Sequence, residues 1–355
     1  MAKKLDNGSK STENDFENQY DSTWDDEDDE EQHDRTKVPK QQIHCTHRDL
    51  YAAKDMQNYR HMCQVPPCLD PPGPQSIKDA ERSEDDEREM FNLRFYQNKI
   101  PSRPDDLYIR DFPRYWFRDY KKLENTHSYI QWLFPIQEQG VNHCAHVLTQ
   151  KEIKFFRKDD ELKRRLLKSY RLMLDFYGIK LLDENTGKVG HAENWRERFE
   201  NLNRKTHNNL RITRILKSLG ILGFEHYQAP LVCFFLTETL VRGRLPRVKR
   251  SVLDYFMFSV LNRSERKELI RFAFEKFETK EEFVWCPKRI QRRFQKEINA
   301  RKAGNPETHP SGSESGAPRK TPKARKQKVK RQDQCLVPPS QPLKMKKNTS
   351  CCCML

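Results

Sequence analysis

Histidine and cysteine side chains cluster twice in this sequence, and imidazole and thiolate are the usual ligands of tetrahedral zinc. The second cluster is the short stretch His143-Cys144-Ala145-His146. The first cluster lies nearer the N-terminus and comprises His44, Cys45, His47, His61, Cys63 and Cys68. Neither has the spacing of a standard zinc finger, so we interpret both as incidental and predict neither a metal site nor a cofactor.

The last four residues, Cys352-Cys353-Met354-Leu355, have the form of a prenylation box. Leucine in the last place favours a geranylgeranyl group, so Cys352 is the candidate lipidation site. Because one lipid chain anchors a protein only reversibly, a membrane surface would need a second contact. That contact is expected from palmitoylation of a neighbouring cysteine or from basic residues, which are Cys351, Cys353, Lys344, Lys346 and Lys347.

Two groups of basic residues could bind polyanions. Residues 318–331 form a lysine- and arginine-rich stretch that resembles a nuclear-import signal, so a nuclear-import receptor is a candidate partner. A second group could form one face of a helix and comprises Arg204, Lys205, His207, Arg211, Arg214 and Lys217. No recognised nucleic-acid module accompanies this face, so we predict a solvated surface and consider a nucleic-acid partner unlikely.

The sequence carries no motif that predicts catalysis. Asn185-Thr186-Gly187-Lys188 lacks the earlier glycine and the following hydroxyl residue of a phosphate-binding loop. The Gly-x-Ser-x-Gly elbow of hydrolases and the His-Glu-x-x-His helix of metalloproteases are both missing from the sequence. We therefore predict a protein that is not an enzyme and acts by binding.

Composition separates a folded centre from two polar ends. The 355 residues are 35% hydrophobic and 34% charged, with a net charge of +15, whereas an ordinary domain is roughly half apolar. The acid run Asp25–Glu31 and the prolines after residue 65 predict a disordered acidic, Pro-rich arm over residues 1–85. Residues 291–355 predict a disordered basic tail. No stretch is long and apolar enough for a membrane span or a signal peptide, so we expect a cytoplasmic and nuclear, perinuclear protein that is not secreted.

Helical periodicity dominates residues 86–290. Thr149 and Glu152 predict a capping box with Leu148 packing on Ile153, and Asp159-Asp160 predicts a second helix start. Gly178 ends the following apolar stripe, and residues 179–189 predict a small hairpin. Further stripes extend to about residue 290. The fold class is therefore all-α, a single helical-bundle domain of about seven helices with a small hairpin.

Several long strings within this region closely resemble the conserved region of the opioid growth factor receptor family. They are NKIPSRP (98–104), HSYIQWLFP (127–135), LMLDFYGIKLLDENTGKV (172–189), RFENLN (198–203), THNNLRITRILKSLGILGFEHYQAPLVCFFLTETLVRGRLP (206–246) and SVLDYFMFSV (251–260). The resemblance covers essentially the whole predicted domain.

This resemblance implies a receptor for opioid growth factor, the pentapeptide Met-enkephalin, that restrains cell growth from the nuclear envelope, nucleus and cytoplasm. Long tandem repeats follow the domain in the best-known receptors, whereas a short basic tail follows it here, which is compatible with the receptor-like paralogue. The alternative is a membrane-associated scaffold or adaptor whose helical domain binds proteins and not opioid peptides. The family motifs assign no ligand-contact residues.

Met-enkephalin requires a partly apolar groove for two aromatic rings and a thioether, and an acid for its amino group. The aromatic-rich stretch 108–134 and the stretch Tyr255-Phe256-Met257-Phe258 are the candidate walls. Asp111, Asp119 and Asp254 are the candidate acids.

Overall fold

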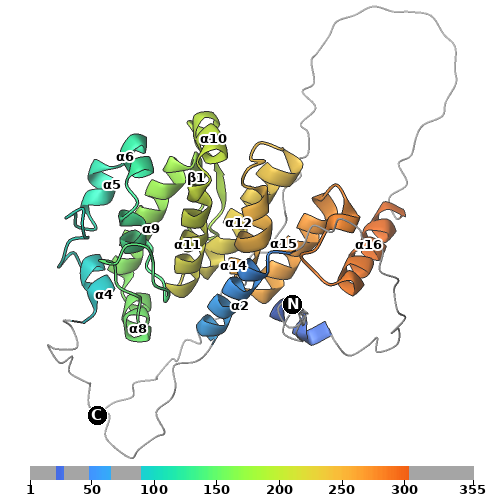
Figure 1. Cartoon of the computed structure of the whole chain (residues 1–355), viewed down its shortest axis with the longest axis horizontal. Helices are drawn as coiled ribbons and strands as arrows, with labels where there is room; N and C mark the ends of the chain where they lie inside the picture. The colour runs from blue at the N-terminus through green and yellow to red at the C-terminus, as the bar shows by residue number, and fades with distance from the viewer. Residues whose placement is uncertain (1–20, 28–47, 65–88, 304–355) are drawn as a thin grey trace, which may run out of the picture.

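The computed structural model describes residues 21–27, 48–64 and 89–303, which form one elongated helical body (Figure 1). Within these ranges the strands are confined to one two-stranded antiparallel hairpin, so the predicted all-α class is confirmed. From α4 (Phe91–Tyr96) onward the helices follow the chain from one end of the body, at α4 and α8 (Gln150–Lys158), to the other, at α15 (Arg263–Lys276) and α16 (Lys288–Ala303) (Figure 1). Every helix of these ranges is too short or too polar to cross a membrane.

Short helices open the domain, where prolines at positions 101, 104, 113 and 135 limit helix length. They surround buried aromatic side chains, among them Phe95, Phe112 and Tyr129, which pack edge-on or tilted against their neighbours. These helices are α4 (Phe91–Tyr96), α5 (Asp111–Tyr115), α6 (Tyr120–Asn125) and α7 (Tyr129–Leu133).

The two longer helices that follow begin where the sequence predicts. Thr149 caps α8 (Gln150–Lys158) in a complete capping box with Glu152, and Asp159 caps α9 (Asp160–Phe176) by accepting hydrogen bonds from the amides of Glu161 and Leu162. Gly178, with φ of 75°, ends the run. The hairpin of β1 (Ile179–Leu181) and β2 (Val189–His191) follows, with Lys180 paired to Gly190.

The second half of the domain is built from helices that bury apolar side chains in a common core. They are α10 (Trp195–Arg204), α11 (His207–Ile221), η2 (Glu225–Tyr227), α12 (Gln228–Leu236), η3 (Thr237–Val241), α13 (Lys249–Ser251), η4 (Val252–Phe256), α14 (Met257–Ser259), α15 (Arg263–Lys276), η5 (Lys280–Glu282) and α16 (Lys288–Ala303). Two of these segments are π-helical turns: η3 continues α12, and η4 leads into α14.

The structure corrects the predicted boundaries at both ends of the domain. The arm was expected to lack regular structure through residue 85, but η1 (Ser22–Glu27) and α2 (Leu50–Gln64) are helical and pack on α14 and α15. In Figure 1 both lie beside these late helices. At the other end, α16 carries the fold to Ala303, beyond the predicted limit of residue 290. The sequence also predicts fewer helices than are present, because helices of three to six residues give no periodic signal.

Candidate peptide-binding groove

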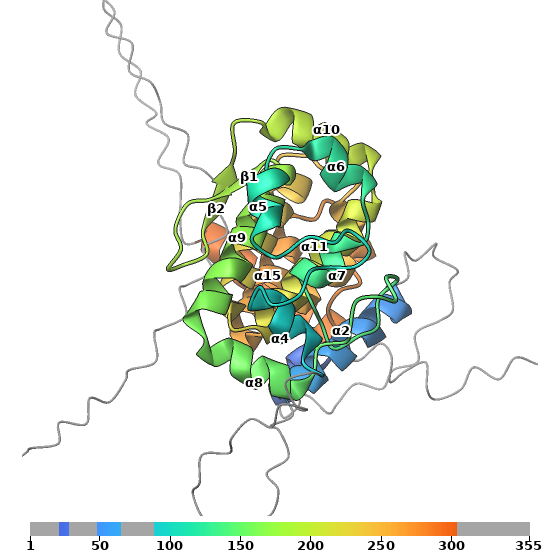
Figure 2. The ribbon, with the colours of Figure 1, turned by 90° about the vertical axis from the view of Figure 1, so that its left-hand side faces the viewer.

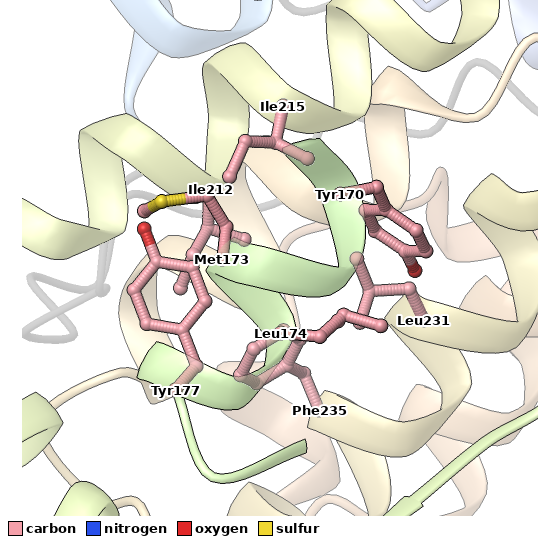
Figure 3. A pocket seen from close by; sticks show the side chains of 8 residues that line it. All are labelled: Tyr170, Met173, Leu174, Tyr177, Ile212, Ile215, Leu231 and Phe235. Carbon is pink, nitrogen blue, oxygen red and sulfur yellow. The ribbon is translucent and has the colours of Figure 1, made fainter. Parts of the chain in front are cut away.

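Two hollows of the described residues bear on ligand binding, a small cavity among buried side chains and a larger groove at the surface. The cavity has a volume of about 10 Å³, which is room for about one water molecule. Figure 3 shows its lining side chains converging from α9, α11 and α12, and they are Tyr170, Met173, Leu174, Tyr177, Ile212, Ile215, Leu231 and Phe235. A peptide cannot enter this space without opening the core.

The open site, which we call the α5–α9 groove, has a volume of about 270 Å³. It lies at the end of the body that faces the viewer in Figure 2, where α5 packs on α9. Ligand pockets for drug-sized molecules begin near 300 Å³, so the groove accommodates part of a short peptide. It is lined by Ile109, Arg110 and Pro113 on the α5 side and by Glu161, Arg165 and Lys168 on α9.

Helix α9 supplies the polar wall of the groove because residues 161, 165 and 168 recur at helical spacing on one face. Arg165 Nε donates to Glu161 Oε1 at 3.0 Å, and its Nη1 donates to the carbonyl oxygen of Tyr96 at the end of α4. Arg164 pairs with the second oxygen of Glu161 at 2.7 Å. Glu161 is therefore neutralised by two arginines. The further cations Arg110 and Lys168 give the groove a net positive charge, so it favours a ligand that carries an anionic group beside an apolar one.

Two of the three predicted ligand-binding acids have other roles. Asp254 is buried, accepts a 2.7 Å hydrogen bond from Trp285 Nε1, and pairs with Arg250. Burial raises the pKa of Asp254, although Trp285 and Arg250 act in the opposite direction. The prediction that Asp254 faces a ligand is wrong, because the π-helical turn η4 directs this carboxylate into the core. Asp119 caps α6 through the amide of Lys122.

Asp111 is the one predicted acid beside the groove. It is the first residue of α5, directly after Arg110, and its Oδ2 accepts a hydrogen bond from the amide of Tyr108 at 3.2 Å. An acid at the start of a helix is also stabilised by the helix dipole.

The predicted aromatic walls are mostly core. In the stretch 108–134 the buried rings are Phe112, Trp116, Tyr129, Trp132 and Phe134, whereas Tyr108, Tyr115 and Phe117 are exposed. In the stretch 255–258, Phe256, Met257 and Phe258 are fully buried. These three side chains therefore cannot form a wall, because their helical segments pack against α2, α11 and α12.

The histidines and cysteines do not gather into a metal site in the part of the chain that the structure describes. Cys144 is exposed, and His146 stacks on the ring of Phe91 with centroids 3.7 Å apart. His61 and Cys63 belong to α2. The remaining members of the first cluster, His44, Cys45, His47 and Cys68, lie outside the described residues, as do residues 318–331 and the candidate lipidation site Cys352.

The basic face predicted for residues 204–217 is not solvated throughout. Arg211 donates to the carbonyl oxygens of Leu123 and Thr126 at 2.9 and 2.8 Å, beside the end of α6. Arg214 Nε donates to the carbonyl oxygen of Phe134 at 2.8 Å, and burial lowers its pKa to about 10. Lys217 is 3% exposed and pairs with Asp55 of α2 and with Glu138. The prediction is wrong for these three residues, because they bind carbonyl groups or join segments, whereas Arg204 and Lys205 are exposed as expected.

Fold and groove together define a helical protein whose accessible site is suited to binding a charged, partly apolar ligand. Residues 85–292 match the conserved region of the opioid growth factor receptor. The chain belongs to the opioid growth factor receptor family, and the resemblance noted in its sequence is confirmed.

The chain is about equally similar to two kinds of relative. It is 49% identical over 255 residues to the opioid growth factor receptor of Mus musculus, covering 72% of this chain and 38% of that protein. The human receptor (Homo sapiens) is 49% identical over 247 residues, which are 70% of this chain and 34% of that protein. The opioid growth factor receptor-like protein 1 of Mus musculus is 48% identical over 240 residues, which are 68% of this chain and 48% of that protein.

In each case the match covers less than half of the relative's length. No solved structure matches the chain.

Proposed function

We propose that this chain is a non-enzymatic receptor-like protein that binds an opioid peptide of the Met-enkephalin type and thereby restrains cell growth. Its membership of a family named for such a receptor is the observation that carries the proposal. The α5–α9 groove is the proposed site, because its lining combines apolar and charged groups.

The chemistry of the groove suits the two ends of the peptide differently. The C-terminal carboxylate of the peptide pairs with Lys168 or Arg110, and the peptide's methionine or phenylalanine side chain packs on Ile109 and Pro113. The N-terminal amino group of the peptide extends toward Asp111 at the start of α5. Because the volume is about 270 Å³, most of the peptide stays on the surface, near the exposed aromatic rings of this region.

Calorimetric titration of Met-enkephalin into the full chain tests the proposal, with a scrambled pentapeptide as the control ligand. We expect saturable binding of Met-enkephalin alone. Lys168→Ala should weaken binding about tenfold, since one charge-assisted hydrogen bond contributes about 1.5 kcal/mol. Lys154→Ala on α8 removes an exposed lysine that does not line the groove and should leave the affinity unchanged. Equal heats from both pentapeptides would refute peptide reception.

A second candidate is a scaffold or adaptor whose helical domain binds another protein. The exposed rings of Tyr108, Tyr115 and Phe117 favour it, because aromatic residues are enriched at protein interfaces. Loss of a co-purifying partner on Tyr115→Ala, with no binding of Met-enkephalin to the unaltered chain, would support this candidate over reception.

The tail supplies two further parts of the proposal. Prenylation of Cys352 would place the protein at a membrane surface, and import through residues 318–331 would carry it between cytoplasm and nucleus. Mass spectrometry of the C-terminal peptide from cells tests the first, and an unmodified Cys352 would refute it. Imaging of a chain that lacks residues 318–331 tests the second, since an unchanged distribution would exclude an import role.

A further inference from the structure

The segment η1 is held against the domain by side chains that are far away in the sequence. Asp21, directly before η1, accepts hydrogen bonds from Arg60 Nη2 at 2.9 Å and from Arg48 Nη2 at 3.2 Å. Thr23 accepts from Arg266 Nε at its hydroxyl, at 2.7 Å, and from Arg263 Nε at its carbonyl oxygen, at 3.0 Å. The contacts on Thr23 join residues that are more than 200 positions apart.

Trp24 provides the apolar part of this contact. Its side chain is 1% exposed, its ring lies edge-on to that of Phe294 of α16, and the ammonium group of Lys267 lies 5.7 Å from its centroid. Separate parts of the surface thus bind the Asp21 carboxylate, the Thr23 hydroxyl and the Trp24 indole.

The arginines are positioned by the domain itself. Arg60 Nη1 donates to the carbonyl oxygen of Phe258 at 2.8 Å, and Arg266 Nη1 donates to that of Val260 at 2.5 Å. Both side chains are buried and fixed on carbonyl groups at the end of α14, so their remaining donors already point at the place that Asp21 and Thr23 occupy. Such preorganisation lowers the cost of binding a peptide.

The covalent connection does not by itself hold η1 in place. A six-residue helix is not stable alone in water, so its conformation depends on this contact. The twenty residues 28–47 separate it from Arg48 and can span up to about 70 Å when extended. In these respects η1 is bound like a separate peptide.

We propose that Arg48, Arg60, Arg263 and Arg266, together with the Trp24 slot on α15 and α16, form a second peptide-binding site. Its ligand is an acidic peptide with the pattern Asp-x-Thr-Trp. The chain's own residues 21–24 occupy the site, and an acidic segment of a partner protein displaces them. The site lies at the other end of the body from the α5–α9 groove (Figure 1). It requires a peptide of different chemistry, so it does not depend on the binding of Met-enkephalin.

A fluorescent nonapeptide with the sequence of residues 21–29 tests the proposal by anisotropy, using the full chain. In the double variant Asp21→Ala/Trp24→Ala the cis segment is disabled and the labelled peptide should bind saturably. In the unaltered chain it should bind about 100-fold more weakly, because a tethered segment competes at an effective concentration of about 1 mM against a dissociation constant of about 10 μM. The same peptide carrying both alanines should bind neither protein.

Variants of the site provide the specificity control. In the double-variant background, Arg48→Gln should reduce the affinity for the nonapeptide at least tenfold, whereas Arg271→Gln, on α15 and paired with Glu268, should not change it. Adding Met-enkephalin should leave the anisotropy unchanged, which separates this site from the proposed receptor function.

Two results would overturn the proposal. One is the absence of saturable binding to the double variant, and the other is equal affinity for the double variant and the unaltered chain. Amide exchange in the unaltered chain gives an independent check that requires no variant. Millimolar nonapeptide should accelerate exchange in residues 21–27 while α15 stays protected, and unchanged exchange in residues 21–27 would likewise contradict displacement.

Discussion

Replacing Glu152 with glutamine is expected to destabilise the domain more than a single polar substitution usually does. The carboxylate is 1% exposed and joins two helices. Its Oε1 accepts from the amides of Asn92 and Leu93 at the start of α4, at 2.8 and 3.2 Å. Its Oε2 accepts from the amide of Thr149 and from Asn92 Nδ2, at 2.9 and 3.2 Å.

Glutamine has almost the same shape but only one acceptor oxygen, so the Thr149 amide and hydroxyl and Asn92 Nδ2 must face its NH₂ group, and of these the hydroxyl can turn to accept. Each buried donor that loses its acceptor costs about 1–3 kcal/mol. Since Thr149 is partly exposed, the oxygen is expected to stay with the amides of α4, and the loss amounts to about 2–4 kcal/mol. With a urea dependence of about 3 kcal/mol per molar, the unfolding midpoint falls by about 1 M.

Urea unfolding of the full chain, followed by circular dichroism at the helical band, measures this shift. Glu200→Gln is the matched control, because that side chain is 72% exposed on α10 and should change stability by less than about 0.5 kcal/mol. Equal midpoints for the two variants would show that the Glu152 carboxylate does not hold α4 to α8.

The remaining predictions concern a titration, a turn and a buried cation. Burial raises the pKa of Glu265 to about 7, so its stabilising contribution is complete below its ordinary pKa and is lost as the pH rises through 7. At pH 8, Glu265→Gln should therefore increase the free energy of unfolding by about 1–3 kcal/mol and raise the melting temperature. At pH 5 both changes should be much smaller. Gly178→Ala should cost about 2 kcal/mol more than Gly243→Ala in urea unfolding. Both have positive φ, but an added Cβ at Gly178 lies 2.7 Å from Trp195 Cα, whereas nothing lies within 4 Å at Gly243. Lys217→Ala should cost about 2–4 kcal/mol and accelerate amide exchange in α2, because it removes the cation between Asp55 and Glu138. Unchanged exchange in α2 would contradict this role of Lys217.

Local signals predicted the parts of the fold in which neighbouring residues decide the structure. The capping box of Thr149 and Glu152, the helix start at Asp159 and the stop at Gly178 all lie where the sequence places them. Each depends on side chains or backbone angles within a few residues, so no tertiary contact was needed to find it.

Parts that depend on distant contacts were missed. Ala52, Met56, Tyr59 and Cys63 recur at helical spacing and could have predicted α2, but the acidic and proline-rich sequence around them favoured a disordered arm. No sequence signal within η1 indicates that Arg60 and Arg266 bind this segment.

The charged lining of the proposed site was missed for a related reason. Glu161, Arg165 and Lys168 look like an ordinary solvated helix face until α5 packs beside them. Likewise Arg211 is classed as a surface residue by its type, although it is 5% exposed and binds carbonyl groups near α6. The pairing of a cation with a carbonyl group far along the chain leaves no periodic signal in the sequence.

Photo-cross-linking of a Met-enkephalin derivative to the full chain tests peptide reception at the α5–α9 groove most directly. We expect cross-links, identified by mass spectrometry, within residues 107–117 and 158–170, and their loss when unlabelled Met-enkephalin is in excess. Cross-links that unlabelled peptide cannot displace, or that fall elsewhere in the domain, would contradict it.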